Sequence, residues 1–202
     1  MRLGRSCGIW IAALAALSGG LAAQAKKAPQ TAAHAAVGEL LAATDKVGNA
    51  QFRHAVVLLV DATAQGAAGL VLNRPGQERL SQVFPKEASA SGRTDTAFWG
   101  GPVDGKRIFC LVQVDGSLRE GKQILPGLYV SDSPALMELA LNAQKPAASF
   151  RVYLGYTGWV RGQLQREIRA GLWRVLPGSA QAIFDADPAT LWTRLQQAKA
   201  KR

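Results

Sequence analysis

The sequence is poor in the side chains from which proteins build metal centres, disulfides and acid–base catalysts. It contains two cysteines and two histidines, of which Cys110 and His54 alone fall within the region with folded periodicity. Zinc needs three or four converging ligands, mostly Cys and His, and a single cysteine forms no intrachain disulfide. Cys110 stands in the apolar run RIFCLVQV, which is typical of a buried small hydrophobic residue. We therefore predict no metal and no cofactor.

Nucleotide-binding motifs are absent as well. There is no GxxxxGK[ST] phosphate loop, and the glycines of GYTGWVRG at positions 155, 158 and 162 do not fit a GxGxxG fingerprint. Nucleophilic catalysis needs a base next to the nucleophile. A serine triad of Ser131 or Ser133 with His54 and Asp132 can be written, but VSDSP already has a role as the start of a helix. We predict no catalytic residue and favour a protein without enzymatic activity.

Positive charge is in excess. The chain has 24 Lys and Arg against 14 Asp and Glu, a formal net charge of +10. This balance attracts anions, whether nucleic acid, an acidic polymer or a membrane surface, without choosing among them. Arg161, Arg166, Arg169 and Arg174 concentrate the charge late in the chain. We interpret them as a solvated face, with a surface for an acidic polymer or partner protein as the sharper alternative.

The first 36 residues predict an export signal and a linker. Two arginines precede an apolar run at residues 8–17, and AQA at residues 23–25 fits a small-x-small cleavage pattern. We predict a signal peptide over residues 1–25, with an uncleaved membrane anchor or a misassigned start codon as alternatives. A flexible linker over 26–36 follows. The predicted location is exported (periplasmic) or membrane-tethered, with a cytoplasmic location as the alternative, and no other membrane segment is expected.

Periodicity from residue 37 onward predicts a single α+β domain over 37–198, followed by a basic tail at 199–202. Strands are expected at 37–44, 54–61, 66–75, 96–105, 107–114, 127–132, 149–156 and 172–177. Helices are expected at 79–84, from Pro134 with Ser133 as its cap, from Trp159, and from Asp187. Asp-Gly pairs at 104–105 and 115–116 predict hairpin turns, and GYTG predicts a strand-to-helix corner. Many strands with few inserted helices indicate α+β architecture rather than a doubly wound parallel sheet.

Five motifs follow one another along this domain. They are GLVLNRP (69–75), FWGGPV (98–103), LYVSDSPALMELA (128–140), YLGYTGWVRGQLQREI (153–168) and LWRVLP (172–177). In this series the chain resembles the YqgE/AlgH family of bacterial proteins, and the similarity runs from about Gly38 to about Leu195.

The resemblance implies a strongly bent mixed sheet that forms a partial barrel, flanked by helices. It also implies an association with regulation of exopolysaccharide (alginate) production, which is a genetic link and specifies no reaction. Family members usually begin at the first strand and look cytoplasmic, so the signal-like segment departs from the pattern. If the chain is exported, a cytoplasmic transcriptional role does not carry over.

Three strand ends supply the candidate ligand residues. Asn-Arg-Pro ends one strand, Gly-Gly-Pro ends another, and GYTG leads toward a helix whose first amides would favour an anion. If these ends converge, we expect a basic pocket walled by Trp99 and two further aromatics. The candidate ligand-binding residues are Asn73, Arg74, Gly100, Gly101, Arg151, Gly155, Tyr156, Gly158, Trp159 and Arg161.

These residues also have a structural interpretation. The glycines can serve a tight corner, the aromatics can be core, and Arg74 can satisfy carbonyls or pair with Asp132 or Glu167. We predict a non-enzymatic binding or regulatory module with a basic pocket or surface, its partner an anionic small molecule or acidic polymer. One alternative is an enzyme that acts on a small anionic substrate at the Arg74/Gly155 region. The other is transcription-related nucleic-acid binding, which requires a cytoplasmic location.

Overall fold

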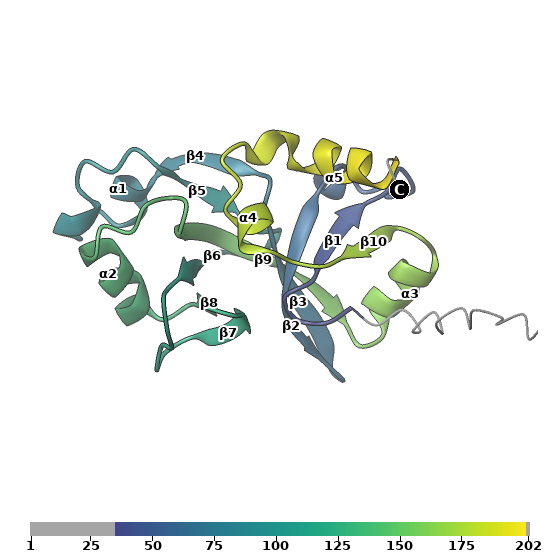
Figure 1. Cartoon of the computed structure of the whole chain (residues 1–202), viewed down its shortest axis with the longest axis horizontal. Helices are drawn as coiled ribbons and strands as arrows, with labels where there is room; N and C mark the ends of the chain where they lie inside the picture. The colour runs from purple at the N-terminus through teal and green to yellow at the C-terminus, as the bar shows by residue number, and fades with distance from the viewer. Residues whose placement is uncertain (1–34, 201–202) are drawn as a thin grey trace, which may run out of the picture. The chain divides into compact units, whose positions relative to one another are not determined.

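The computed structural model describes residues 35–200, with side chains to residue 197 (Figure 1). The predicted signal peptide, most of the predicted linker and the end of the basic tail lie outside this range. Within it, ten strands form one sheet with the path β10-β1-β2-β3-β9-β6-β8-β7, and β4 and β5 lie off this path. The strands are β1 (Leu40–Ala43), β2 (Val56–Thr63), β3 (Gly66–Val71), β4 (Pro75–Arg79), β5 (Thr96–Trp99), β6 (Val103–Gln113), β7 (Lys122–Leu125), β8 (Leu128–Ser131), β9 (Phe150–Val160) and β10 (Trp173–Leu176).

The sheet is mixed and mostly antiparallel, and it is not closed. Strand β5 pairs in parallel with β9, and the other pairs are antiparallel. Strand β9 is the common element, because it pairs with β3, β5 and β6. Residues 56–60 of β2 are buried on both faces, as their continuous apolar run predicts. The predicted α+β fold with a bent mixed sheet is confirmed.

The bend brings β7, at one end of the strand path, close to β1 and β2 near the other end. The Lys122 ammonium of β7 lies 2.7 Å from the Asp61 carboxylate of β2. A Cβ atom added at Gly38, just before β1, would lie 2.4 Å from the Ile124 carbonyl oxygen of β7. Because Gly38 also has a φ of 87°, this close approach needs glycine.

Helices cover the sheet at different places. Helix α2 lies beside β6 and β8, α3 lies next to β10, and α5 crosses β1 (Figure 1). Ser133 occupies the N-cap position of α2 as predicted, but its hydroxyl donates 2.9 Å to the Glu120 carboxylate and caps no helix amide. In the described part of the chain no helix is long and apolar enough to cross a membrane. The helices are α1 (Leu80–Val83), α2 (Pro134–Asn142), α3 (Gln163–Arg169), α4 (Ala180–Ile183) and α5 (Leu191–Ala200), with 3₁₀ turns η1 (Ala50–Phe52), η2 (Ala88–Ala90) and η3 (Pro188–Thr190).

The two predicted Asp-Gly hairpins are wrong. Asp104 and Gly105 lie inside β6, where Asp104 has a φ of 44° and the register with β9 shifts. The pair therefore forms a bulge, which also uses positive-φ residues. Asp115 and Gly116 do follow the end of β6, but β6 pairs with β8 and β9 rather than with the next strand, β7.

The predicted corner at Gly155–Gly158 is also wrong. Strand β9 continues through both glycines to Val160, and the chain turns at Gly162, whose φ is 72°. The helix expected from Trp159 begins at Gln163, and Val160 belongs to the strand and is 70% exposed. Gly155 serves a close backbone contact along the strand, since a Cβ there would lie 2.6 Å from the Gly101 carbonyl oxygen, and local sequence patterns do not distinguish such a glycine from one in a turn.

Candidate functional site

The predicted ligand segments do meet, but they meet as backbone against backbone. The Val71 amide donates to the Gly100 carbonyl at 3.0 Å, and the Gly100 amide donates to the Leu154 carbonyl at 2.8 Å. A Cβ at Gly100 would lie 2.1 Å from the Gly155 oxygen, and one at Gly101 would lie 2.2 Å from the Tyr156 carbonyl carbon. The amide and the carbonyl of Gly100 are therefore occupied by neighbouring strands.

Asn73 and Arg74 use their polar groups within the fold. The Asn73 amide group accepts from the Val56 amide and donates to the His54 carbonyl, both at 2.9 Å, and the residue is buried. The Arg74 guanidinium donates to the Arg53 carbonyl at 2.5 Å and to the Asn73 carbonyl at 3.4 Å. Partial burial lowers the pKa of Arg74 from its ordinary value. Arg74 therefore bonds main-chain carbonyls, rather than pairing with Asp132 or Glu167.

The candidate ligand residues Arg151 and Arg161 lie at opposite ends of β9. Arg151 is 7% exposed and donates to the carbonyls of Ile183 (2.9 Å) and Asp185. Arg161 is exposed beyond the other end of the strand. Ten residues of strand span about 33 Å, so the two cannot hold one small ligand.

Gly158 and Trp159 line a small pocket that contains a carboxylate. The Trp159 indole donates to Glu167 Oε2 at 2.8 Å. Tyr156 does not line this pocket; it lies edge-on to Phe109 with ring centroids 5.8 Å apart and lines a separate, more open pocket together with Gly158 and Trp159. Helix α3 begins only at Gln163, so these residues form no helix N-terminus for an anion.

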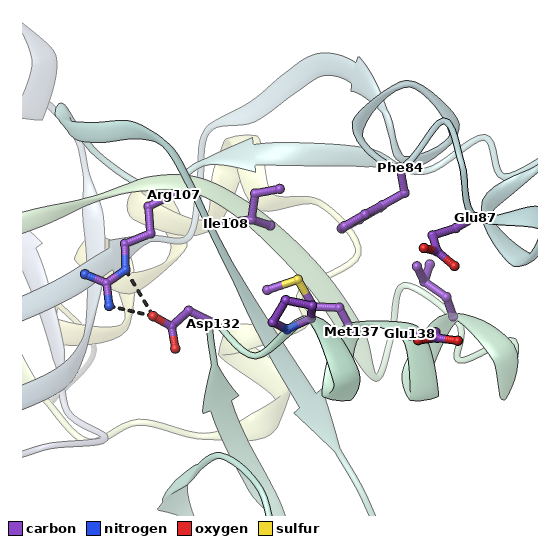
Figure 2. A pocket seen from close by; sticks show the side chains of 9 residues that line it. Phe84, Glu87, Arg107, Ile108, Asp132, Met137 and Glu138 are labelled. Carbon is purple, nitrogen blue, oxygen red and sulfur yellow. Dashed lines mark hydrogen bonds and ion pairs between the residues drawn. The ribbon is translucent and has the colours of Figure 1, made fainter.

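A larger cleft, which we call the α2 groove, lies between β6 and helix α2. Figure 2 shows Arg107 and Asp132 at one end, Glu87 and Glu138 at the other, and Ile108, Phe84 and Met137 between them. Its volume is about 390 Å³. The lining residues are Phe84, Glu87, Arg107, Ile108, Asp132, Pro134, Met137, Glu138 and Leu141.

Four separate segments position these side chains. Arg107 and Ile108 come from β6, Asp132 follows β8, and α2 supplies Met137 from one face. Phe84 ends α1. The floor rests on a buried cluster of Leu80, Ala90, Ala97, Cys110, Val112, Tyr129, Leu136, Met137, Ala140, Leu141, Phe150 and Val152. The apolar spacing of α2 is visible in the sequence, but the segments that oppose it are not.

An ion pair fixes one end of the groove. Arg107 Nη2 and Nε lie 2.5 and 3.1 Å from Asp132 Oδ2, and both side chains are 48% exposed. The hydrogen bond from Arg107 lowers the pKa of Asp132 below its ordinary 3.8. The Arg107 guanidinium also lies 5.0 Å from the Phe109 ring centroid, which restricts its orientation. The charges of Arg107 and Asp132 therefore neutralise each other at this end of the groove.

Reactive groups are not gathered at the groove. Cys110 is buried beneath it, and burial raises the pKa of its thiol to about 12, which suppresses the thiolate. His54 stacks on Trp192 with ring centroids 4.0 Å apart, while Asp132 pairs with Arg107. No group of three or more His, Cys, Asp or Glu side chains suited to a metal occurs within the described residues.

Sequence and structure comparisons place this architecture among known proteins. The family model described as AlgH-like matches residues 40–201. The chain belongs to the AlgH-like family. A UPF0301 protein of Myxococcus xanthus is 36% identical over 157 residues, covering 76% of this chain and 84% of that protein. A UPF0301 protein of Thermobifida fusca is 32% identical over 171 residues, covering 78% and 84%.

Solved structures agree with the AlgH-like assignment. The solution structure of the AlgH protein from Pseudomonas aeruginosa is 30% identical and superposes with a TM-score of 0.64, covering 80% of this chain and 86% of that one. A crystal structure of a Corynebacterium diphtheriae protein is 19% identical with a TM-score of 0.69, covering 82% and 87%, and supports the fold alone. The family resemblance drawn from the five motifs is confirmed.

Proposed function

We propose that the protein is a non-catalytic binding module whose α2 groove takes a short apolar segment of another protein that carries a basic residue. The observation that carries this proposal is the charge arrangement. Glu87 and Glu138 flank an apolar floor and make no ion pair within residues 35–197. The groove has three carboxylates and one guanidinium, whereas the chain as a whole is strongly basic.

The size and surface of the groove suit a side chain or two of a peptide. Ligand sites commonly enclose about 300–1,000 Å³ and combine an apolar lining with a few polar groups. Met137 adds a flexible, polarisable side chain that adapts to ligands of different shape. Charge complementarity then favours a lysine or arginine of the partner beside the two glutamates.

Two labelled peptides test the proposal. Lys-Leu-Leu-Phe-Lys and Glu-Leu-Leu-Phe-Glu share an apolar centre and differ in charge. Fluorescence anisotropy should show at least about tenfold tighter binding of the lysine peptide at low salt. The double variant Glu87→Gln/Glu138→Gln should lose this preference. The matched control Glu78→Gln changes an exposed carboxylate of β4 and should bind as the wild type does. Equal binding of both peptides, or tighter binding of the glutamate peptide, contradicts the proposal.

An acidic-polymer surface is a second candidate, supported by three arginines around α3. Arg161, Arg166 and Arg169 are exposed, whereas Arg174 lies under α5 and donates to the Leu195 carbonyl at 2.5 Å. Retention of polyphosphate by the wild type and not by Arg166→Ala/Arg169→Ala would support this surface. An enzyme acting on an anionic substrate at Arg74 and Gly155 has less support, because the Arg74 guanidinium serves main-chain carbonyls.

Export and a regulatory role are further proposals. Export rests on residues 1–25, and regulation would follow from reversible occupation of the groove by a partner. We expect a tagged full-length chain to fractionate with the periplasm or the membrane. If the protein is found wholly in the cytoplasm, the export proposal is contradicted and nucleic acid becomes a candidate partner again. That result does not bear on the α2 groove proposal.

A further inference from the structure

A second pocket, which we call the tryptophan pocket, is formed largely by aromatic rings around one carboxylate. Its volume is about 160 Å³, and Phe52, Trp159, Trp173 and Glu167 are among its lining residues. Trp173 stands edge-on to both of the other rings, with centroids 6.0 Å apart and interplanar angles of 76° to Phe52 and 81° to Trp159. The exposed Gly48 and Asn49 form part of the rim, so solvent reaches the pocket.

Neutral donors hold the carboxylate in place. Glu167 Oε2 accepts from the indoles of Trp159 (2.8 Å) and Trp173 (2.7 Å). Its other oxygen accepts from the Gln163 amide at 2.9 Å. The Gln163 carbonyl oxygen in turn accepts from the Val160 amide at 3.1 Å. These bonds join α3 to β9 and β10, and they orient the carboxylate without cancelling its charge.

Glu167 makes no ion pair within residues 35–197. Two nearby cations, Lys46 and Arg166 of α3 itself, lie beside Gly171 and Gly162 and make no ion pair with Glu167. A partly buried carboxylate without a counter-ion favours a cation over the anion that the sequence predicted for this region. The sign expected of a ligand at Gly158 and Trp159 is therefore reversed.

The side chains that line the tryptophan pocket indicate which class of cation it can bind. A divalent metal requires several oxygen ligands, and the described residues gather no such group. Perpendicular aromatic rings with a carboxylate instead suit a quaternary ammonium, whose charge interacts with ring faces and which has no N–H donors to satisfy. A cavity of about 150 Å³ holds a benzene-sized molecule, so the space fits a trimethylammonium group.

We propose that the tryptophan pocket binds a small quaternary ammonium compound of the choline type. Phe52, Trp159 and Trp173 supply the ring faces, and Glu167 supplies the opposite charge. This site is independent of the α2 groove, because the two share no lining residue.

Choline and its uncharged isostere 3,3-dimethyl-1-butanol form the decisive pair of probes. In a ¹H–¹⁵N NMR titration, choline should shift the indole N–H signals of Trp159 and Trp173 saturably and leave that of Trp192 unchanged. Because the isostere has the same shape without charge, it should bind at least about tenfold more weakly. Absence of a saturable choline shift, or equal affinity for both probes, overturns the proposal.

Two variants test whether choline binds in the tryptophan pocket. Glu167→Gln keeps an oxygen that accepts from the indoles, so the fold should persist while choline affinity falls at least about tenfold. Phe52→Leu removes one half-buried ring and should weaken choline binding with little effect on the fold. Glu78→Gln serves as the charge control. Unchanged affinity in folded Glu167→Gln or in Phe52→Leu contradicts the assignment.

A further experiment distinguishes a lipid headgroup from a free solute as the carrier of the ammonium group. Phosphatidylcholine vesicles that sediment the wild type and release it on addition of choline would identify a lipid headgroup as the source. Choline binding without sedimentation would identify a free solute. Either result retains the quaternary ammonium chemistry.

Discussion

The α2 groove and the tryptophan pocket are both acidic sites in a basic chain, but they compensate charge by different means. In the groove, Asp132 is neutralised by an exposed guanidinium, and two further carboxylates stand free of ion pairs within the described residues. In the tryptophan pocket, Glu167 is held by indole and amide N–H groups. The first arrangement suits a large, adaptable ligand at a solvated surface. The second suits a small cation in a rigid site, because neutral donors fix geometry and leave charge available.

Gly100, whose backbone packs directly on β9 outside both sites, should give the largest effect when it is changed to alanine. The added Cβ would lie 2.1 Å from the Gly155 oxygen, which forces the strands apart. We expect a loss of about 4 kcal/mol in the free energy of unfolding, or no folded protein. Urea denaturation measures it. Gly105→Ala, with no atom within 4 Å of its Cβ, should change stability by less than about 0.5 kcal/mol. Similar values for the two variants would break the claim that Gly100 is closely packed against β9.

Arg151 tests whether the sheet needs a buried cation away from both sites. Arg151→Met keeps much of the apolar stem but leaves the Ile183 and Asp185 carbonyls without this donor. We expect a loss of about 3 kcal/mol by thermal or chemical unfolding. Exposed Arg161→Met should cost less than about 0.5 kcal/mol. Equal losses of stability at the two positions would show that Arg151 is not a structural residue and would restore it as a candidate ligand residue.

Two substitutions of Glu167 distinguish the contribution of its hydrogen bonds from that of its charge. Glu167→Leu leaves two buried indole N–H groups unpaired and should cost about 2 kcal/mol. Glu167→Gln should cost about 1 kcal/mol, since the amide oxygen still accepts from both indoles and the bond from the Gln163 amide is lost. The two variants can be compared by urea denaturation. A larger cost for Gln than for Leu would refute the neutral-donor account.

Arg107→Gln should have the smallest effect on stability, less than about 0.5 kcal/mol, because the ion pair is exposed. Its signature is instead the pKa of Asp132, which should rise toward 3.8 in a ¹³C NMR titration. Since the native pKa is lowered, the pair stabilises the fold above pH 3.8 and its contribution is lost as the pH falls below that value. An unchanged Asp132 titration in the variant would show that Arg107 does not set it.

Much of the fold was predictable because its signals are local. The apolar runs identified β2 and the central part of β6, and Pro134 marked the start of α2. The predicted strand 149–156 stopped short of the end of β9 at Val160, because the glycines at 155 and 158 suggested a corner, whereas both lie within the strand. The short strands β4 and β7 and the single turn α4 were missed, since four or five residues carry little periodicity.

The sites were less predictable because they depend on non-local contacts. Gly158 and Trp159, two of the predicted ligand residues, line one pocket, but the charge of that pocket depends on Glu167, which the sequence suggested only as a partner for Arg74. In the α2 groove, Glu87 and Met137 are about fifty residues apart, and no sequence pattern links them. Charge composition also misled, because a net charge of +10 says nothing about the sign of one cleft.

The most direct test of the account is the anisotropy titration of the lysine peptide against the wild type and Glu87→Gln/Glu138→Gln. The two carboxylates of the α2 groove are predicted to account for at least about a tenfold difference in affinity, with the variant still folded. An affinity that is unchanged or higher in the folded double variant would contradict the α2 groove as a site for a basic, apolar partner segment.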